Sequence, residues 1–346
     1  MKIMLTAGIL TLLHTSASLT GDLTAPVIPD SAKQFMPQST ASFSDGLLEV
    51  LRDLVLHARP DLKEASGICL CLVAIVMLVS LVGSMPGKTQ SAADLAGCVA
   101  IGGVLLGAAN SMIQLGVQSV GQITEYGKLL LPVMTTALAA QGGVSSSVAL
   151  YTGTAFFNSL MASWITKILT PMIYLFLGLS IACACLGEDM LIRLRDGLKW
   201  LMTWLLKTAM YTFTGYIGIT GVVSGTTDAA ALKAAKLTIS GVVPVVGGIL
   251  SDASEAVLVG VGTAKNAAGL YGIFAILAMF LGPFLRIGAH YLLIKGTSVI
   301  CSVFGNKRTA GLIMDFSSAM GLVLAMNGAV SIMLLISVVC YMKGVI

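Results

Sequence analysis

Long apolar segments separated by short polar ones make up most of this chain. Eight segments approach the 20 or so apolar residues that a helix needs to cross the hydrocarbon of a bilayer. They occupy residues 67–85, 95–117, 148–165, 168–186, 200–223, 267–285, 287–304 and 316–341. This pattern predicts an all-α, polytopic integral membrane protein with about eight transmembrane helices.

The number of crossings is open between about six and ten, because some boundaries between segments are weak. Lys167 alone separates the segments at 148–165 and 168–186, so these two form either two spans or one broken or tilted element. Trp164 and Trp200 lie at segment ends beside lysines, as residues at the membrane–water interface do.

The N-terminal part divides into two pieces ahead of the membrane domain at 66–346. Residues 1–19 have a positive Lys2, an apolar stretch and small residues at 16–18, which predicts a secretory signal peptide rather than an uncleaved anchor. Residues 20–65 are the most polar part of the chain, and we expect them outside the cytoplasm. In them Ser44 begins a predicted amphipathic helix that lies on the membrane, docks a partner or packs on the protein itself.

Two apolar stretches, at 129–140 and 239–250, are too short for ordinary spans and contain proline and glycine. Paired short, broken segments are typical of transporter-like sites at the bilayer midplane. Irregular backbone at that depth needs protein or a water-filled cavity around it. We therefore expect either re-entrant, cavity-lining segments or kinked ordinary helices. The candidate residues in and beside them are Pro132, Gly142, Gly143, Pro244, Gly247, Gly248, Asp252 and Glu255.

Lys207 is a ninth candidate, because it lies seven residues inside the apolar segment at 200–223. A charge at the centre of a membrane helix costs about 2.5–3.5 kcal/mol on insertion scales. Lys207 and Glu255 could face a polar interior or pair across the bundle. The alternative for Lys207 is that its ammonium reaches toward the lipid headgroups.

Basic residues do not settle the orientation. Residues 187–199 and 306–308 are both rich in lysine or arginine, which favours the cytoplasmic side for both. If both short segments are re-entrant, residues 187–199 fall on the opposite side. The sequence leaves this conflict open.

Composition agrees with a membrane protein and narrows the chemistry. Only 10% of the residues are charged and 56% are hydrophobic, whereas soluble domains carry about 25% charged residues. The net charge of +4 forms no basic stripe and aromatic residues make up 6%, which argues against nucleic acid as a partner. No catalytic, cofactor or metal-binding motif is present, so we predict no enzyme, no cofactor and no metal site. Gly103 and Gly107 form a GxxxG pair that suits internal packing or a homo-oligomer.

Three segments carry a more specific resemblance. They are LLLPVMTTALAAQGGVSSS at 129–147, GVVPVVGGILSDASEAVL at 241–258 and KNAAGLYG at 265–272. They resemble the stage III sporulation protein AE family of endospore-forming bacteria, and the likeness extends from about residue 40 to the C-terminus. No catalytic residues are defined for that family.

The resemblance implies a non-enzymatic membrane core of the channel complex that joins mother cell and forespore. It implies a multi-pass location in the mother-cell membrane around the forespore. The implied partners are the lipid bilayer, ring-forming subunits, an ATPase and a forespore protein. The alternative function is a stand-alone secondary transporter for a small solute.

Overall fold

The structure is a computed structural model that describes residues 33, 36, 52, 59–83, 89–141, 143–242, 247–304 and 307–343, without the side chains from 220 to 265. These ranges are helical and contain no strand. The helices are α4 (Arg59–Gly83), α5 (Thr89–Ala140), α6 (Val144–Trp164), a π-helical turn η1 (Ile165–Leu169), α7 (Thr170–Leu186), α8 (Asp189–Val242), α9 (Gly247–Phe304) and α10 (Lys307–Lys343). The predicted signal peptide and most of the polar segment after it lie outside the described residues.

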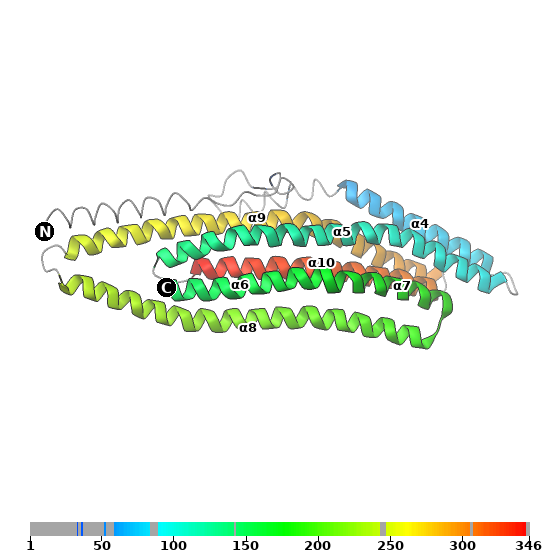
Figure 1. Ribbon diagram of the computed structural model, residues 1–346. Helices are drawn as coiled ribbons and strands as arrows, with labels where there is room; N and C mark the ends of the chain where they lie inside the picture. The colour runs from blue at the N-terminus through cyan, green and yellow to red at the C-terminus, as the bar shows by residue number, and fades with distance from the viewer. Residues whose placement is uncertain are drawn as a thin grey trace.

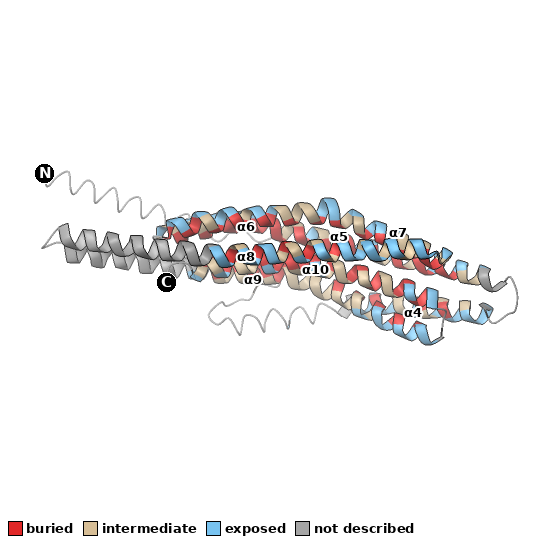
Figure 2. Ribbon diagram, turned by 90° about the horizontal axis from the view of Figure 1, so that it is seen from below, coloured by how far each residue is buried: buried red, intermediate tan, exposed pale blue. Residues whose placement is uncertain are grey.

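The helices run side by side in one elongated bundle (Figure 1). Helix α10 packs against α5, α6, α7, α8 and α9. In its most apolar window 56% of the residues are buried, compared with 17% in α4. Burial coloured along the ribbons shows the same inward-facing stripes on the packed helices (Figure 2). Helix α10 is therefore the centre of the core, and α4 lies at its edge.

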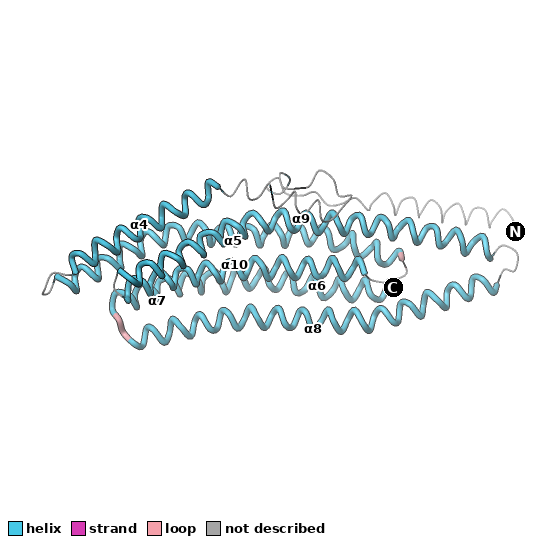
Figure 3. The backbone as a smooth tube through the Cα atoms, turned by 180° about the vertical axis from the view of Figure 1, so that it is seen from behind, coloured by secondary structure: helices cyan, strands magenta, loops and turns pink. Residues whose placement is uncertain are grey.

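Several predicted spans are parts of longer helices. The described residues contain five helices long and apolar enough to cross a membrane. The all-helical class is confirmed, but the count of about eight spans is not. The segments at 267–285 and 287–304 are both in α9, because the lone charge of Arg286 leaves the helical backbone hydrogen bonds intact. An unbroken helical trace along α9 is visible in Figure 3.

The segments at 148–165 and 168–186 are also one continuous element, joined by η1. Pro171 lacks an N–H and cannot bond to the carbonyl four residues earlier, which disturbs the regular α-helical pattern. A single π-helical turn over Ile165–Leu169 absorbs this irregularity. The Thr170 hydroxyl donates to the Ile165 carbonyl at 2.7 Å. Of the two readings of the boundary at Lys167, the structure has the continuous one.

The predicted break at Pro132 is wrong. Helix α5 continues through Pro132 to Ala140, and the chain turns at Gln141–Gly143 instead. Membrane helices tolerate proline where neighbouring helices and hydroxyl side chains compensate for the lost hydrogen bond. Here the Thr135 hydroxyl donates to the Leu131 carbonyl at 2.7 Å. The first short segment is therefore the end of a long helix and not a separate re-entrant element.

The second short segment is divided between two helices. Residues 239–242 end α8, and residues 247–250 begin α9. Gly247 and Gly248 are helical, whereas Pro244, like Gly142 near the first segment, lies outside the described residues. The two long helices lie beside each other in Figures 1 and 3. This segment belongs to the ends of two full-length helices.

Both basic segments lie at the same end of the bundle. Arg195 Nη1 donates to Asp315 Oδ2 at 2.8 Å, and Lys199 Nζ donates to Ser318 Oγ at 3.0 Å. These contacts join the start of α8 to the start of α10. Arg308 lies against Gly187, the left-handed residue (φ 72°) that ends α7. The conflict in the basic-residue pattern therefore disappears, because α8 and α9 each run the length of the bundle once.

Candidate functional site

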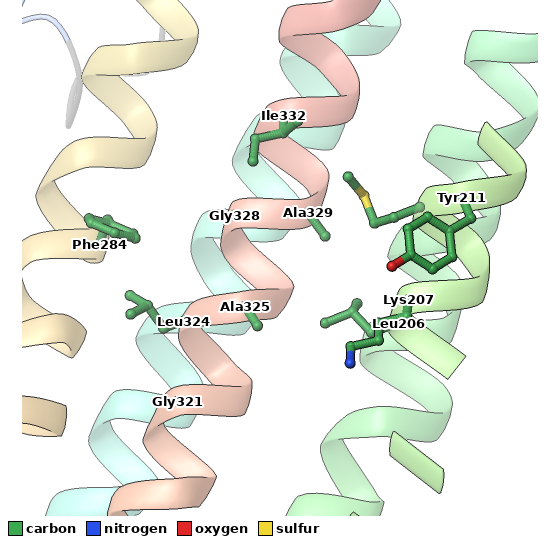
Figure 4. Close-up of a pocket in the computed structure, with 11 residues that line it drawn as sticks. Leu206, Lys207, Tyr211, Phe284, Gly321, Leu324, Ala325, Gly328, Ala329 and Ile332 are labelled. Atoms are coloured by element: carbon green, nitrogen blue, oxygen red, sulfur yellow. The ribbon is translucent and has the colours of Figure 1, made fainter. Parts of the chain in front are cut away.

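A groove of about 420 Å³ opens between α8 and α10. Its walls come from α8 and α10, with one residue contributed by α9 (Figure 4). The lining residues are Leu206, Lys207, Met210, Tyr211, Phe284, Gly321, Leu324, Ala325, Gly328, Ala329 and Ile332. Of the candidates from the sequence, Lys207 lies in this groove.

Small residues on α10 make the groove hollow. Gly321, Ala325 and Gly328 follow one another at spacings of four and three, so they share one face of the helix. No other atom lies within 4 Å of the position that a Cβ would take at Gly328. Larger side chains at these positions would fill the space between α10 and α8.

Lys207 and Tyr211 are the polar side chains of the groove. They are one helical turn apart on α8, and the Lys207 ammonium and the Tyr211 hydroxyl both project toward α10 (Figure 4). Both residues are exposed, Tyr211 to 74%, so the groove opens on the outer surface of the bundle. No acidic side chain is among its lining residues. An anion entering the groove would meet one cation and one hydroxyl donor.

Glu255, the predicted partner of Lys207, lies far from it along the bundle. Lys207 is 35 residues before the end of α8, whereas Glu255 is 8 residues after the start of α9. Because the two helices are antiparallel neighbours, the difference corresponds to about 40 Å along the axis. The predicted pairing across the bundle is therefore wrong.

The remaining candidates do not gather around Lys207. Pro132 is inside α5, and Gly143 precedes α6. Gly247, Gly248 and Asp252 are in the first turns of α9, where side chains are not described. The structure therefore gives these residues no common site with Lys207.

A second pocket, of about 260 Å³, lies at the basic end of the bundle. Arg195 and Asp315 form an ion pair in it, with side chains 19% and 14% exposed. The second bond of Arg195 is to the exposed Asp196 at 2.8 Å. Lys307 and Arg308 also line the pocket. This pair fixes the start of α8 to α10.

The buried polar residues of the core include two asparagines. Asn327 on α10 is fully buried, and its Nδ2 donates to the Val323 carbonyl at 3.2 Å. Asn158 on α6 is 7% exposed. The polarity of Asn158 is visible in the sequence of its span, whereas Asn327 carries no local signal of its burial. Among the described residues, no three of His, Cys, Asp and Glu group as metal ligands would.

Comparison with known proteins identifies related sequences. The family description Stage III sporulation protein AE matches residues 32–344. Stage III sporulation protein AE of Bacillus subtilis (strain 168) is 22% identical over 225 residues, which cover 65% of this chain and 56% of that protein. The chain therefore aligns with little more than half the length of this relative. No solved structure matches the chain.

Proposed function

The chain belongs to the stage III sporulation protein AE family, and from this membership we propose that it forms the membrane core of a sporulation channel complex between mother cell and forespore. A role in sporulation follows from the family itself. The family match over residues 32–344 is the observation that carries the proposal. The resemblance of the short segments at 129–147 and 241–258 was the first sign of it.

The form of the bundle supports a core role over a peripheral one. Five described helices are long and apolar enough to cross a membrane, which suits a multi-pass protein of the mother-cell membrane. Large helices packed around a central α10 give a rigid body on which other subunits can assemble. We propose that ring-forming subunits, an ATPase and a forespore protein are its partners, and that it conducts or scaffolds without catalysing a reaction.

The proposal is tested in the sporulating host. Deleting the gene should stop forespore development after engulfment and lower the yield of heat-resistant spores by orders of magnitude, and the intact gene supplied elsewhere should restore it. A normal spore yield in the deletion strain would refute the role. Solute uptake by vesicles that hold the purified protein alone would favour the stand-alone transporter instead.

We propose that the basic end of the bundle faces the cytoplasm, because lysine and arginine concentrate on that side of membrane proteins. A cysteine at Arg193 should then be labelled by an impermeant maleimide only after the cells are opened. A cysteine at Val144, an exposed residue at the other end, should be labelled in intact protoplasts. The native cysteines are first changed to serine or alanine, and the opposite labelling pattern would reverse the orientation.

A further inference from the structure

Three cations on three helices lie at one level of the bundle. Lys207 follows the first residue of α8 by 18 residues, Arg286 precedes the last residue of α9 by 18, and Lys167 precedes the last residue of α7 by 19. These helix ends meet at the basic end, so each cation is about 27–29 Å from it along the axis. That distance is close to the thickness of the hydrocarbon layer, about 30 Å.

Apolar helix surface extends on both sides of this level. Toward the basic end are the exposed Leu175 of α7 and Val299 of α9, and away from it are Phe156 of α6 and Ile332 of α10. Charged side chains between two apolar zones are expected where a membrane meets water, since lysine and arginine there reach the headgroups. The level of Lys207 therefore has the composition of a membrane interface.

The groove at this level has the size and lining of a ligand site. Its volume of about 420 Å³ is within the range of small-molecule pockets, and its lining is apolar apart from Lys207 and Tyr211. The apolar part continues along α10 to Ile332, which is 46% exposed at the outer surface. A molecule with an anionic head and an apolar chain matches this arrangement, with the head at Lys207.

We propose that the groove between α8 and α10 binds an anionic phospholipid, with the phosphate at Lys207 and Tyr211 and an acyl chain against Gly321, Ala325 and Gly328. The bilayer supplies this ligand directly, because the groove opens on the outer surface. The positive charge of Lys207, which no acidic residue of the groove balances, selects an anionic lipid over a zwitterionic one. The proposal requires only that the chain is a membrane protein.

Native mass spectrometry of the full-length protein in detergent tests the site with phosphatidylglycerol and phosphatidylcholine. The wild-type protein should retain phosphatidylglycerol about fivefold more tightly, the effect of one lysine near anionic lipid. Lys207→Gln should remove this preference. Gly328→Leu should reduce retention of both lipids, because the new side chain enters the empty space beside Gly328.

Lys167→Gln is the matched control, since it removes an exposed cation at the same level but outside the groove. It should leave the preference unchanged. An equal loss in both lysine variants would overturn the proposal in favour of general attraction at the interface, and normal retention by Gly328→Leu would place the lipid elsewhere. Cross-linking of a cysteine at Ala325 to a protein in native membranes would also overturn it, because a partner helix would then fill the groove.

Discussion

Replacing Arg195 with leucine is expected to lower the free energy of unfolding by about 2–3 kcal/mol. Breaking a fully buried ion pair costs about 3–5 kcal/mol, because the remaining charge is left without compensation. The Arg195 and Asp315 side chains are 19% and 14% exposed, so water screens part of that cost. Unfolding of the purified protein in mixed micelles, followed by circular dichroism against denaturing detergent, measures the change.

Arg193→Leu is the control for this prediction. Arg193 is two residues away on the same helix and is exposed, so its loss should change the free energy of unfolding by less than about 0.5 kcal/mol. Exchanging the charges in Arg195→Asp with Asp315→Arg should recover part of the loss. If Arg193→Leu and Arg195→Leu destabilise equally, the contact between α8 and α10 does not carry the stability assigned to it.

Gly116→Leu is expected to destabilise the bundle by about 3 kcal/mol or more, since overpacked cores force helices apart. Gly116 on α5 is buried against α10, where an added Cβ would collide with Val323 and lie 2.9 Å from Asn327 Nδ2. Ile287 of α9 lies behind them at 3.7 Å. The same detergent titration measures the loss of stability.

Gly103→Leu on the same helix makes the matched comparison. No atom lies within 4 Å of a Cβ at Gly103, so the larger side chain should be accepted. Leucine is also the better helix former by about 0.8 kcal/mol, and stability should stay level or rise slightly. Equal tolerance at both glycines would contradict the close approach of α5 and α10 at Gly116.

The sequence predicted the helical class and the family, but it divided the helices too finely. Hydropathy is judged over about 20 residues, so a single charge at Lys167 or Arg286 ends an apolar segment although the helix continues. The ion pair of Arg286 with Glu64 of α4, at 3.3 Å, joins residues 222 positions apart. Only the packing of distant helices accounts for a charge in the interior of α9.

The candidate site was predictable in part for the same reason. Lys207 is visible in the sequence as a charge within an apolar segment. The opposite wall is not, because Gly321, Ala325 and Gly328 follow α8 by more than a hundred residues, and glycine and alanine are common throughout the chain. A search for small residues at spacings of three and four in the last span could have found them. The roles of Pro244, Asp252 and Glu255 stay predictions.

The central position of α10 has a consequence for biosynthesis. Because α10 emerges from the ribosome after its five neighbours, those neighbours enter the bilayer before their shared contact surface exists. The newly inserted helices must remain apart, or loosely associated, until α10 enters between them. Loss of the C-terminal helix would therefore leave an open assembly for membrane proteases rather than a smaller folded protein.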